Sequence, residues 1–262
     1  MNEPGIVTLN TENIGGEHIC CAISDKKCAN GVQLKKEWLQ QRFQEGLRFK
    51  KLDVRQKVFI EYIPAEYAWC PVEAPGYIFI NCFWVAGSYK GKGYGKKLLE
   101  ECLEESGATN GAIAVTSRTK RPYLSDKSFF IYNGFEVCDQ ASPYFELVVR
   151  KFKEDAPTPK FKQSVHEQKT DVAKGFQVLY TAQCPYTDHY VGELADCARE
   201  RSIPVETRRI ESAGEAQSAP TPYTSYSLFY NGHFITHEIL TRSKFEKHID
   251  SWIEKYGLPD AE

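Results

Sequence analysis

The chain has 262 residues, a length that favours two domains over one. Hydrophobic residues make up 42% and charged residues 26% of it, which is ordinary globular composition. The net charge of −2 and the scattered lysines and arginines give no electrostatic support to binding of nucleic acid or of a membrane surface. No apolar run approaches the roughly 18 residues that cross a bilayer. Because Met1–Thr8 also lacks the pattern of a signal peptide, we expect a soluble, cytoplasmic protein.

Nine cysteines are spread along the chain, and several lie in apolar segments. An odd number of thiols in a cytosolic protein of this size argues against a disulfide framework. The sequence has no Cys-x-x-Cys pair and no Cys/His spacing of the zinc-binding type. His18 with Cys20, Cys21 and Cys28 is the cluster that offers a metal ion the most ligands, and unreactive thiols are the alternative. We favour unreactive thiols and predict no metal site.

The first half of the chain alternates helical and extended patterns. Residues Val32–Gly46 place Trp38, Leu39 and Phe43 at helical spacing before a terminating glycine. Bulky and β-branched content predicts strands at Phe49–Val54, Lys57–Ile63, Gly76–Val85, Ala112–Ser117, Phe135–Cys138 and Tyr144–Phe152. Further helices are predicted at Gly93–Ser106 and Asp126–Tyr132. Residues 1–152 therefore read as one α/β (α+β) domain.

The composition changes at residues 153–174, which are mostly polar, carry Pro157 and Pro159 and show little periodicity. We predict a linker there. A second α/β pattern fills residues 175–262, and the pair Asn231-Gly232 within it is a strong hairpin signal. Strands are predicted at Phe176–Tyr180, Val205–Ile210, Tyr226–Tyr230 and His233–Glu238, and helices at Tyr190–Arg201 and Ser243–Lys255. No internal repeat relates the two halves.

The chemistry concentrates at residues 85–99, VAGSYKGKGYGKKLL, where an apolar strand runs through a basic, glycine-rich loop into a helix. Gly91, Gly93 and Gly95 permit close approach of the backbone to a ligand. Exposed amides and the positive end of the helix dipole suit a pyrophosphate. A turn that carries only solvated lysines is the alternative, and the strand–loop–helix context favours phosphate binding over it.

Two common phosphate-binding patterns do not fit this loop. No Ser or Thr follows Lys96 or Lys97, as the P-loop of nucleotide triphosphatases requires. The final glycine of the dinucleotide fingerprint is replaced by Lys96 when counting starts at Gly91 and by Leu98 when it starts at Gly93. The phosphate ligand is therefore of another class.

The loop resembles the acetyl-CoA loop of the GNAT superfamily of N-acyltransferases, whose pattern is Arg/Gln-x-x-Gly-x-Gly/Ala after the fourth strand. Lys90 stands at the Arg/Gln position, and Gly93 and Gly95 match. Downstream, residues 129–135, FFIYNGF, are similar to the aromatic helix of that family, which ends in Gly-Phe. The two signatures occur in the expected order, and the resemblance covers roughly residues 1–152.

The resemblance implies a mixed sheet that splays between its fourth and fifth strands. Acetyl-CoA is implied to enter that gap, with its pantetheine hydrogen-bonded along the fourth strand. The backbone amide of Val85 is implied to polarise the thioester carbonyl. The residues implied to contact acetyl-CoA are Phe83, Val85, Lys90, Gly91, Lys92, Gly93, Tyr94, Gly95, Lys96 and Phe130.

The catalytic acid and base depart from the family pattern. The tyrosine often assigned as the acid is replaced by Phe130, and Tyr132, two residues later, is the substitute we consider. The fourth strand has Asn81 where many relatives carry an acidic residue, so Glu61 and Glu66 are the candidate bases. Each is equally compatible with a solvated carboxylate, and direct attack by a neutral amine needs neither. Non-catalytic members of this fold exist as well.

The second half resembles a thioredoxin-like domain, because the strand FQVLY is followed by TAQCPYT with Cys184 just before a helix. A helix N-terminus favours the thiolate, so Cys184 is a candidate reactive thiol; a structural role is the alternative. Thr187 occupies the second cysteine position, which excludes a dithiol mechanism at this motif. Ala219-Pro220-Thr221 resembles the cis-proline loop, with Pro222 in competition. The combination resembles the YoaP-like acetyltransferases.

We therefore predict an acetyl-CoA-dependent N-acyltransferase that acts on an amine of a small molecule or peptide. A non-catalytic acyl-CoA-binding module is one alternative. A monothiol thioredoxin- or glutaredoxin-like protein that uses Cys184 is the other. The sequence leaves the acceptor, the acyl chain and the oligomeric state open.

Overall fold

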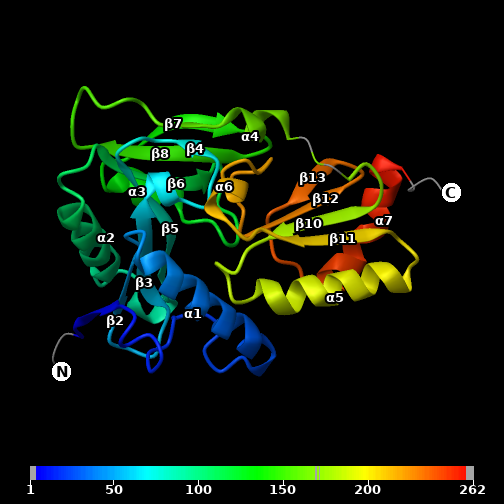
Figure 1. Ribbon diagram of the computed structural model, residues 1–262, viewed down its shortest axis with the longest axis horizontal. Coiled ribbons are helices and arrows are strands. Elements are labelled where there is room, and N and C mark those ends of the chain that lie inside the picture. The colour runs from blue at the N-terminus through cyan, green and yellow to red at the C-terminus, as the bar shows by residue number, and fades with distance from the viewer. Residues whose placement is uncertain (1–3, 169, 171, 258–262) are drawn as a thin grey trace. The chain divides into compact units, whose positions relative to one another are not determined.

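The computed structural model describes residues 4–168, 170 and 172–257 (Figure 1). Their contacts divide into two compact units. The first unit comprises residues up to Ile23, Lys36–Ala68 and Val72–Lys162, and the second comprises Ser24–Lys35, Trp69–Pro71 and the residues from Gln163 onward. The helix α1 (Ala29–Phe43) contributes to both units, so the two are not simply consecutive in the sequence.

The first unit is built on a seven-stranded sheet in the order β1-β2-β3-β5-β6-β8-β7. Adjacent strands in it are antiparallel except for the parallel pair β5–β6. The strands are β1 (Ile6–Leu9), β2 (Arg48–Leu52), β3 (Val58–Pro64), β5 (Tyr77–Val85), β6 (Gly111–Ser117), β7 (Glu136–Ala141) and β8 (Phe145–Lys151). The mixed sheet expected from the sequence is confirmed, and a short pair, β4 (Val72–Glu73) with β9 (Lys160–Phe161), accompanies it.

A bulge and a separation shape the middle of this sheet. Glu61 on β3 pairs with Cys82 on β5, whereas the next residue, Tyr62, pairs with Ile80, so Asn81 is the extra residue of a β-bulge. The pairing of β5 with β6 ends at the same level, at Ile80. The rest of β5 therefore keeps β3 as its neighbour on one side and leaves its other edge without a strand.

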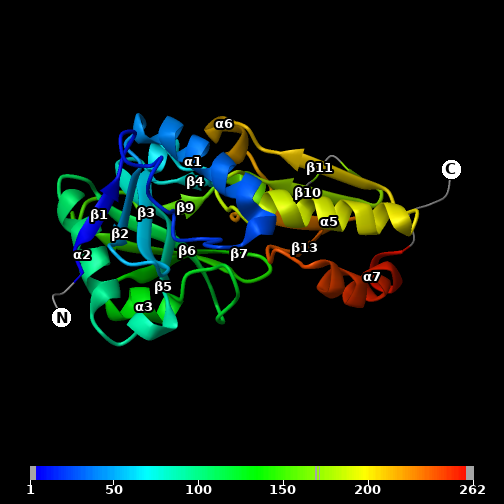
Figure 2. The same cartoon turned by 90° about the horizontal axis from the view of Figure 1, so that it is seen from below.

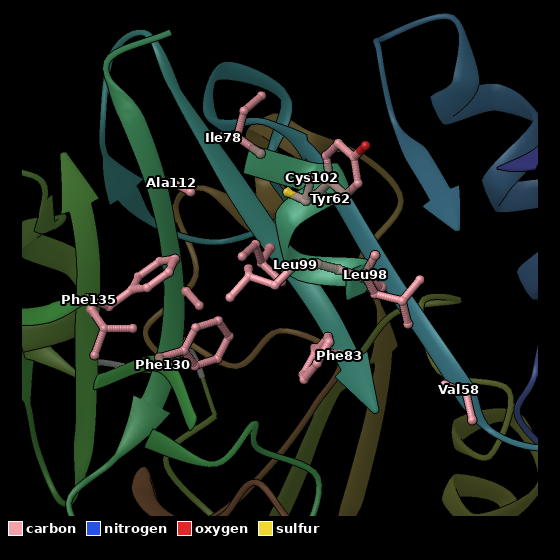
Figure 3. Packing of buried hydrophobic residues seen from close by; sticks show 14 of the residues in the cluster. Val58, Tyr62, Ile78, Phe83, Leu98, Leu99, Cys102, Ala112, Phe130 and Phe135 are labelled. Atoms are coloured by element: carbon pink, nitrogen blue, oxygen red, sulfur yellow. The ribbon is translucent and has the colours of Figure 1, made fainter. Parts of the chain in front are cut away.

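One face of the sheet packs against the helices α2 (Tyr94–Glu105) and α3 (Lys127–Tyr132). Alternate residues of β3 point to this face, as the period of a strand requires. Figure 3 shows their side chains with those of β5, α2 and α3 in one apolar core. Its fully buried members include Ile60, Leu98, Leu99, Cys102 and Phe130. In Figure 2 the part of α1 that belongs to the first unit lies on the other face.

An ion-pair network around one buried lysine ties β2 and β3 to α2. The Lys50 side chain is 4% exposed, and its Nζ lies 2.6 Å from a carboxylate oxygen of both Glu101 and Glu105. The Tyr62 hydroxyl donates a hydrogen bond to Glu105 as well. Burial opposes the charge of Glu105, but the hydrogen bonds from Lys50 and Tyr62 outweigh it and hold the pKa of this carboxyl below its usual value.

The second unit contains a four-stranded sheet in the order β11-β10-β12-β13. The first pair, β11–β10, is parallel, and β12 and β13 run antiparallel to their neighbours. The strands are β10 (Phe176–Tyr180), β11 (Val205–Arg209), β12 (Tyr226–Tyr230) and β13 (His233–Thr236), and the helices are α4 (Gln163–Glu167), α5 (Thr187–Glu200), α6 (Ala213–Ala216) and α7 (Arg242–Tyr256). Apolar side chains of β10, β12, α5 and α7 form its core. The hairpin expected at Asn231-Gly232 is confirmed, with φ values of +47° and +76°.

Two segments from the N-terminal half belong to this second unit. The Asn30 amide donates a 2.8 Å hydrogen bond to Asp188 on the first turn of α5. The glycine after it, Gly31, packs directly on the carbonyl group of Pro185. The Thr224 hydroxyl donates to the carbonyl oxygen of Trp69. Residues 24–35 and 69–71 therefore pack at the end of the sheet where β10 leads into α5.

The segment predicted as a linker, residues 153–174, contains regular structure, namely β9 and α4. Phe161 and Val165 explain the difference, because both are buried apolar side chains in an otherwise polar stretch. The implied cis-proline near residue 220 is wrong. Among the described residues the structure has a cis peptide bond at Ser142–Pro143 and at no other position.

Candidate active site

The glycine-rich loop follows β5 and ends where α2 begins. A short 3-10 turn, Gly87–Tyr89, comes first. Gly91 and Gly93 then adopt φ values of +71° and +83°, a left-handed conformation that other residues rarely adopt. Gly93 is also the residue that caps α2, and it offers no side chain that satisfies the first amides of the helix. These amides are therefore open to an anion.

The loop forms one wall of a cavity of about 950 Å³, large enough for a cofactor. The opposite wall is made by the segment between β6 and α3 and by α3 itself. The lining residues from the loop and β5 are Phe83, Trp84, Val85, Tyr89, Lys90, Gly91, Gly93, Gly95 and Lys96. Those from the opposite wall are Lys120, Arg121, Pro122, Leu124, Ser125, Asp126, Phe129, Tyr132 and Asn133.

The free edge of β5 supplies backbone hydrogen-bonding groups. The amide of Ala86 donates to the carbonyl oxygen of Lys57, next to β3. Because donors alternate along an antiparallel strand, the amides of Val85 and Phe83 point to the other edge, from which β6 has separated. Both residues line the cavity. An extended ligand is thus offered an unpaired strand edge that leads to the glycine-rich loop.

Gly95 is required for a different reason. A Cβ atom at this position would lie 3.2 Å from Val85, 3.3 Å from Phe83 and 3.4 Å from Phe129. The helix α2 therefore passes the end of β5 at a distance that only glycine permits without adjustment of its neighbours.

Three of the residues implied to contact acetyl-CoA lie outside the cavity wall. Phe130 is 0% exposed and belongs to the apolar core. The Lys92 ammonium lies 5.7 Å from the centre of the Tyr89 ring, and the ring of Tyr94 packs against the same tyrosine.

The predicted acid and base candidates occupy very different environments. Tyr132 lines the cavity, and 86% of its side chain is exposed. Glu61 is 0% exposed and accepts a 3.1 Å hydrogen bond from the amide of Asn81 at the bulge. Glu66 is exposed and accepts a hydrogen bond from the backbone amide of Gly76, which fixes the loop between β3 and β5.

On the opposite wall of the cavity, sequence reasoning found α3 with Tyr132 but missed the segment between β6 and α3. Arg121 lies there with its guanidinium 3.7 Å from the centre of the Tyr144 ring. Asp126 caps α3 by accepting a hydrogen bond from the amide of Ser128, and its pKa lies below the usual value chiefly because the Ser128 side chain donates to it. The sequence signal that was available is the run Lys120-Arg121 after a buried strand.

The Cys184 side chain is half-buried and packs against the core of the second unit, with Thr187 donating to the carbonyl oxygen of Cys184. His18 and Cys20, part of the cluster considered for a metal, lie in the first unit, where burial raises the pKa of Cys20 to about 12. The described residues contain no group of three or more metal-ligating side chains. No helix within the described ranges has the length and apolar character to span a bilayer.

Comparison with known proteins identifies the family. The family model "Acetyltransferase (GNAT) family" matches residues 30–123, and the model "YoaP-like" matches residues 204–247. The chain is 41% identical over 243 residues to the uncharacterised N-acetyltransferase YoaP of Bacillus subtilis, covering 92% of this chain and 96% of that protein. The chain belongs to the GNAT acetyltransferase family. It carries the YoaP-like region of that relative as well.

Solved GNAT structures resemble part of the chain more distantly. The PaiA N-acetyltransferase of Thermoplasma acidophilum, in complex with coenzyme A, is 19% identical and covers 56% of this chain and 99% of its own, with a TM-score of 0.40. A GNAT acetyltransferase of Brucella melitensis, in complex with acetyl-CoA, is 16% identical and covers 60% of this chain and 92% of its own, with a TM-score of 0.37.

Membership of the family confirms the predicted enzyme class and cofactor. The chain is an N-acetyltransferase whose acetyl donor is acetyl-CoA. The comparisons give no support to a non-catalytic binding module or to a monothiol oxidoreductase.

Proposed function

We propose that this GNAT enzyme holds acetyl-CoA in the 950 Å³ cavity and transfers the acetyl group to the amine of a small molecule or peptide. The observation that carries the proposal is the free edge of β5 beside the glycine-rich loop. The pantetheine pairs with the free edge of β5, and the pyrophosphate meets the amides that begin α2. The Val85 amide, at that free edge, donates to the thioester carbonyl.

Glu61 is the base of the proposed reaction. The amine nitrogen attacks the thioester carbon, and the carbon–sulfur bond breaks. The proton that the amine loses passes through one bridging water to Glu61, which is fully buried and lies behind the residues that line the cavity. Two observations support it over Glu66: its position at the bulge where β5 and β6 separate, and its hydrogen bond from Asn81, which orients the carboxylate. Glu66 is instead engaged by a loop amide.

Tyr132 supplies the proton that the departing coenzyme A thiolate takes up. Its hydroxyl-bearing ring lines the cavity on the side opposite the free strand edge. The phenylalanine at the usual family position, Phe130, is fully buried and has no proton to give.

Steady-state kinetics with a panel of amines tests the assignment of the base. Glu61→Gln preserves shape and hydrogen bonding but removes the proton acceptor, so kcat should fall by roughly 100-fold or more with little change in the KM for acetyl-CoA. Glu73→Gln, at an exposed carboxylate paired with Lys160, is the matched control. A larger loss of kcat in Glu66→Gln than in Glu61→Gln would show that the base has been assigned wrongly.

We propose a thioredoxin-like fold for the second unit. For the whole chain we propose two domains, at residues 1–152 and 175–262. The sheet order β11-β10-β12-β13, its parallel first pair and the position of Cys184 before α5 support the fold. Limited proteolysis tests the boundary, since the first cut should fall within residues 153–174 but outside β9 and α4, where Phe161 and Val165 are buried. The cytoplasm remains the predicted compartment.

A further inference from the structure

Arg121 lies on the cavity wall opposite the glycine-rich loop, in the segment that joins β6 to α3. Its guanidinium stacks on the Tyr144 ring at 3.7 Å, which fixes the plane of the group. The Tyr144 side chain is itself 9% exposed, so the platform is anchored in the protein. A guanidinium held in this way presents its N–H groups in a defined direction.

The Nε–H of Arg121 is buried and has no hydrogen-bond partner. A buried donor on a charged group without a partner costs more free energy than a neutral one, so such groups are normally paired. No carboxylate forms an ion pair with Arg121 among the described residues. The guanidinium therefore lacks a counter-charge. Because Arg121 lines the cavity, an anion bound there can approach its terminal N–H groups.

The neighbouring lysines on the cavity wall differ from Arg121 in this respect. Lys120 lies 3.2 Å from a carboxylate oxygen of Asp126, and Lys96 lies 3.5 Å from one of Glu100. Their charges are balanced within the protein. Lys90 on the glycine-rich loop, like Arg121, has no ion-pair partner within the described part of the chain. Among the residues that the structure describes, the cavity thus has two cations without an ion-pair partner, Lys90 on one wall and Arg121 on the other.

Coenzyme A carries two separate anionic groups, the pyrophosphate and the 3′-phosphate of its adenosine. The proposed function assigns the pyrophosphate to the loop that contains Lys90. Resting on that assignment, we propose that Arg121 binds the 3′-phosphate and makes the enzyme specific for coenzyme A over its 3′-dephospho form. The flat, stacked guanidinium matches the geometry of a phosphate, to which it donates two parallel hydrogen bonds.

Calorimetric titration with coenzyme A and with 3′-dephospho-coenzyme A tests the proposal on the full chain. The wild type should bind coenzyme A tighter than the dephospho form by roughly tenfold or more, the range of a charge-assisted hydrogen bond. Arg121→Gln should lose this preference and bind both forms with similar affinity. Arg118→Gln, an exposed arginine in the same segment outside the cavity wall, should keep it. Arg121→Lys keeps the positive charge but lacks the two parallel N–H donors of the guanidinium, so it should retain part of the preference for coenzyme A.

Three results would overturn the proposal. Equal affinity of the wild type for both coenzymes would show that Arg121 does not bind the 3′-phosphate. An undiminished preference for coenzyme A in a folded Arg121→Gln variant would show the same. If Arg121→Gln instead raises the KM of acceptors that carry a carboxylate and leaves coenzyme preference intact, the anion belongs to the acceptor. These results leave acetyl-CoA binding at the glycine-rich loop untouched, whereas failure of the wild type to bind either coenzyme refutes both proposals.

Discussion

Substitution of Gly31 by alanine tests whether residues 24–35 are bound to the second unit as the structure places them. Gly31 is the third residue of α1. A Cβ atom there would lie 2.0 Å from the carbonyl oxygen of Pro185, and real Cβ contacts do not fall below 3.0 Å. The helix and the Pro185 backbone must therefore separate by about 1 Å, and neither is a flexible side chain that moves aside.

We expect Gly31→Ala to change the free energy of unfolding in the direction opposite to that predicted from helix propensity alone. Glycine to alanine in a free helix stabilises it by about 0.5–1 kcal/mol. Insertion of a methyl group into a close contact costs about 1–3 kcal/mol. We therefore expect Gly31→Ala to lower the free energy of unfolding by about 1 kcal/mol. Gly192→Ala on α5, where a Cβ meets nothing within 4 Å, should raise it by about 0.5–1 kcal/mol.

Urea unfolding followed by circular dichroism measures both variants, and amide hydrogen exchange localises the change. Faster exchange of residues 24–35 and of the first turn of α5 in Gly31→Ala is expected, because the Asn30–Asp188 hydrogen bond lies next to the strained contact. If Gly31→Ala stabilises the protein as much as Gly192→Ala does, the contact with Pro185 is absent in solution and the reasoning is wrong.

Two further predictions concern charge and thiol chemistry. The pKa of Glu105 is held below its usual value, so its contribution to stability is present above the unfolded pKa and is lost as the pH falls through the lower folded value. The urea concentration at the unfolding midpoint should therefore drop less between about pH 6 and pH 3 in Lys50→Met than in the wild type. An equal drop in both proteins would contradict the stabilising role of the Lys50–Glu105 ion pair. A brief iodoacetamide pulse at neutral pH should label half-buried Cys184 before Cys20, which is fully buried with a pKa raised to about 12. Mass spectrometry that finds the reverse order refutes this assignment of environments.

The sequence predicted most elements of regular structure because they carry clear periodicity or glycine punctuation. The strand predicted at Phe176–Tyr180 matches β10, and the predicted helices are present within a few residues of their expected ends. The missed elements are short. The strands β4 and β9 have two residues each, and α6 has four, too few to repeat any pattern.

The candidate site was predictable where a local motif marks it, at the glycine-rich loop and at α3, and not in the segment that joins β6 to α3. The shape of the loop at residues 90–96 depends on backbone conformation, which the spacing of its glycines indicates directly in the sequence. Arg121 depends on Tyr144, 23 residues away, for its orientation, and single-sequence patterns do not contain such pairings. The hydrogen bond between Asn81 and Glu61 was not predictable for the same reason, because it depends on the bulge in the pairing of β3 with β5.

The location of acetyl-CoA is most directly tested by titrating it into the wild type, Gly93→Asp, Gly95→Asp and Gly87→Asp. Gly93→Asp places a carboxylate where the pyrophosphate is proposed to meet the start of α2, at a left-handed φ of +83°. Gly95→Asp forces a side chain against Val85, Phe83 and Phe129, where α2 passes the end of β5. Gly87 has open space around it and no such φ, and it lies outside the residues that line the cavity. We predict micromolar binding by the wild type and Gly87→Asp, and no detectable binding by folded Gly93→Asp or Gly95→Asp. Unchanged affinity in a folded Gly93→Asp variant would contradict the assignment of this loop to the cofactor.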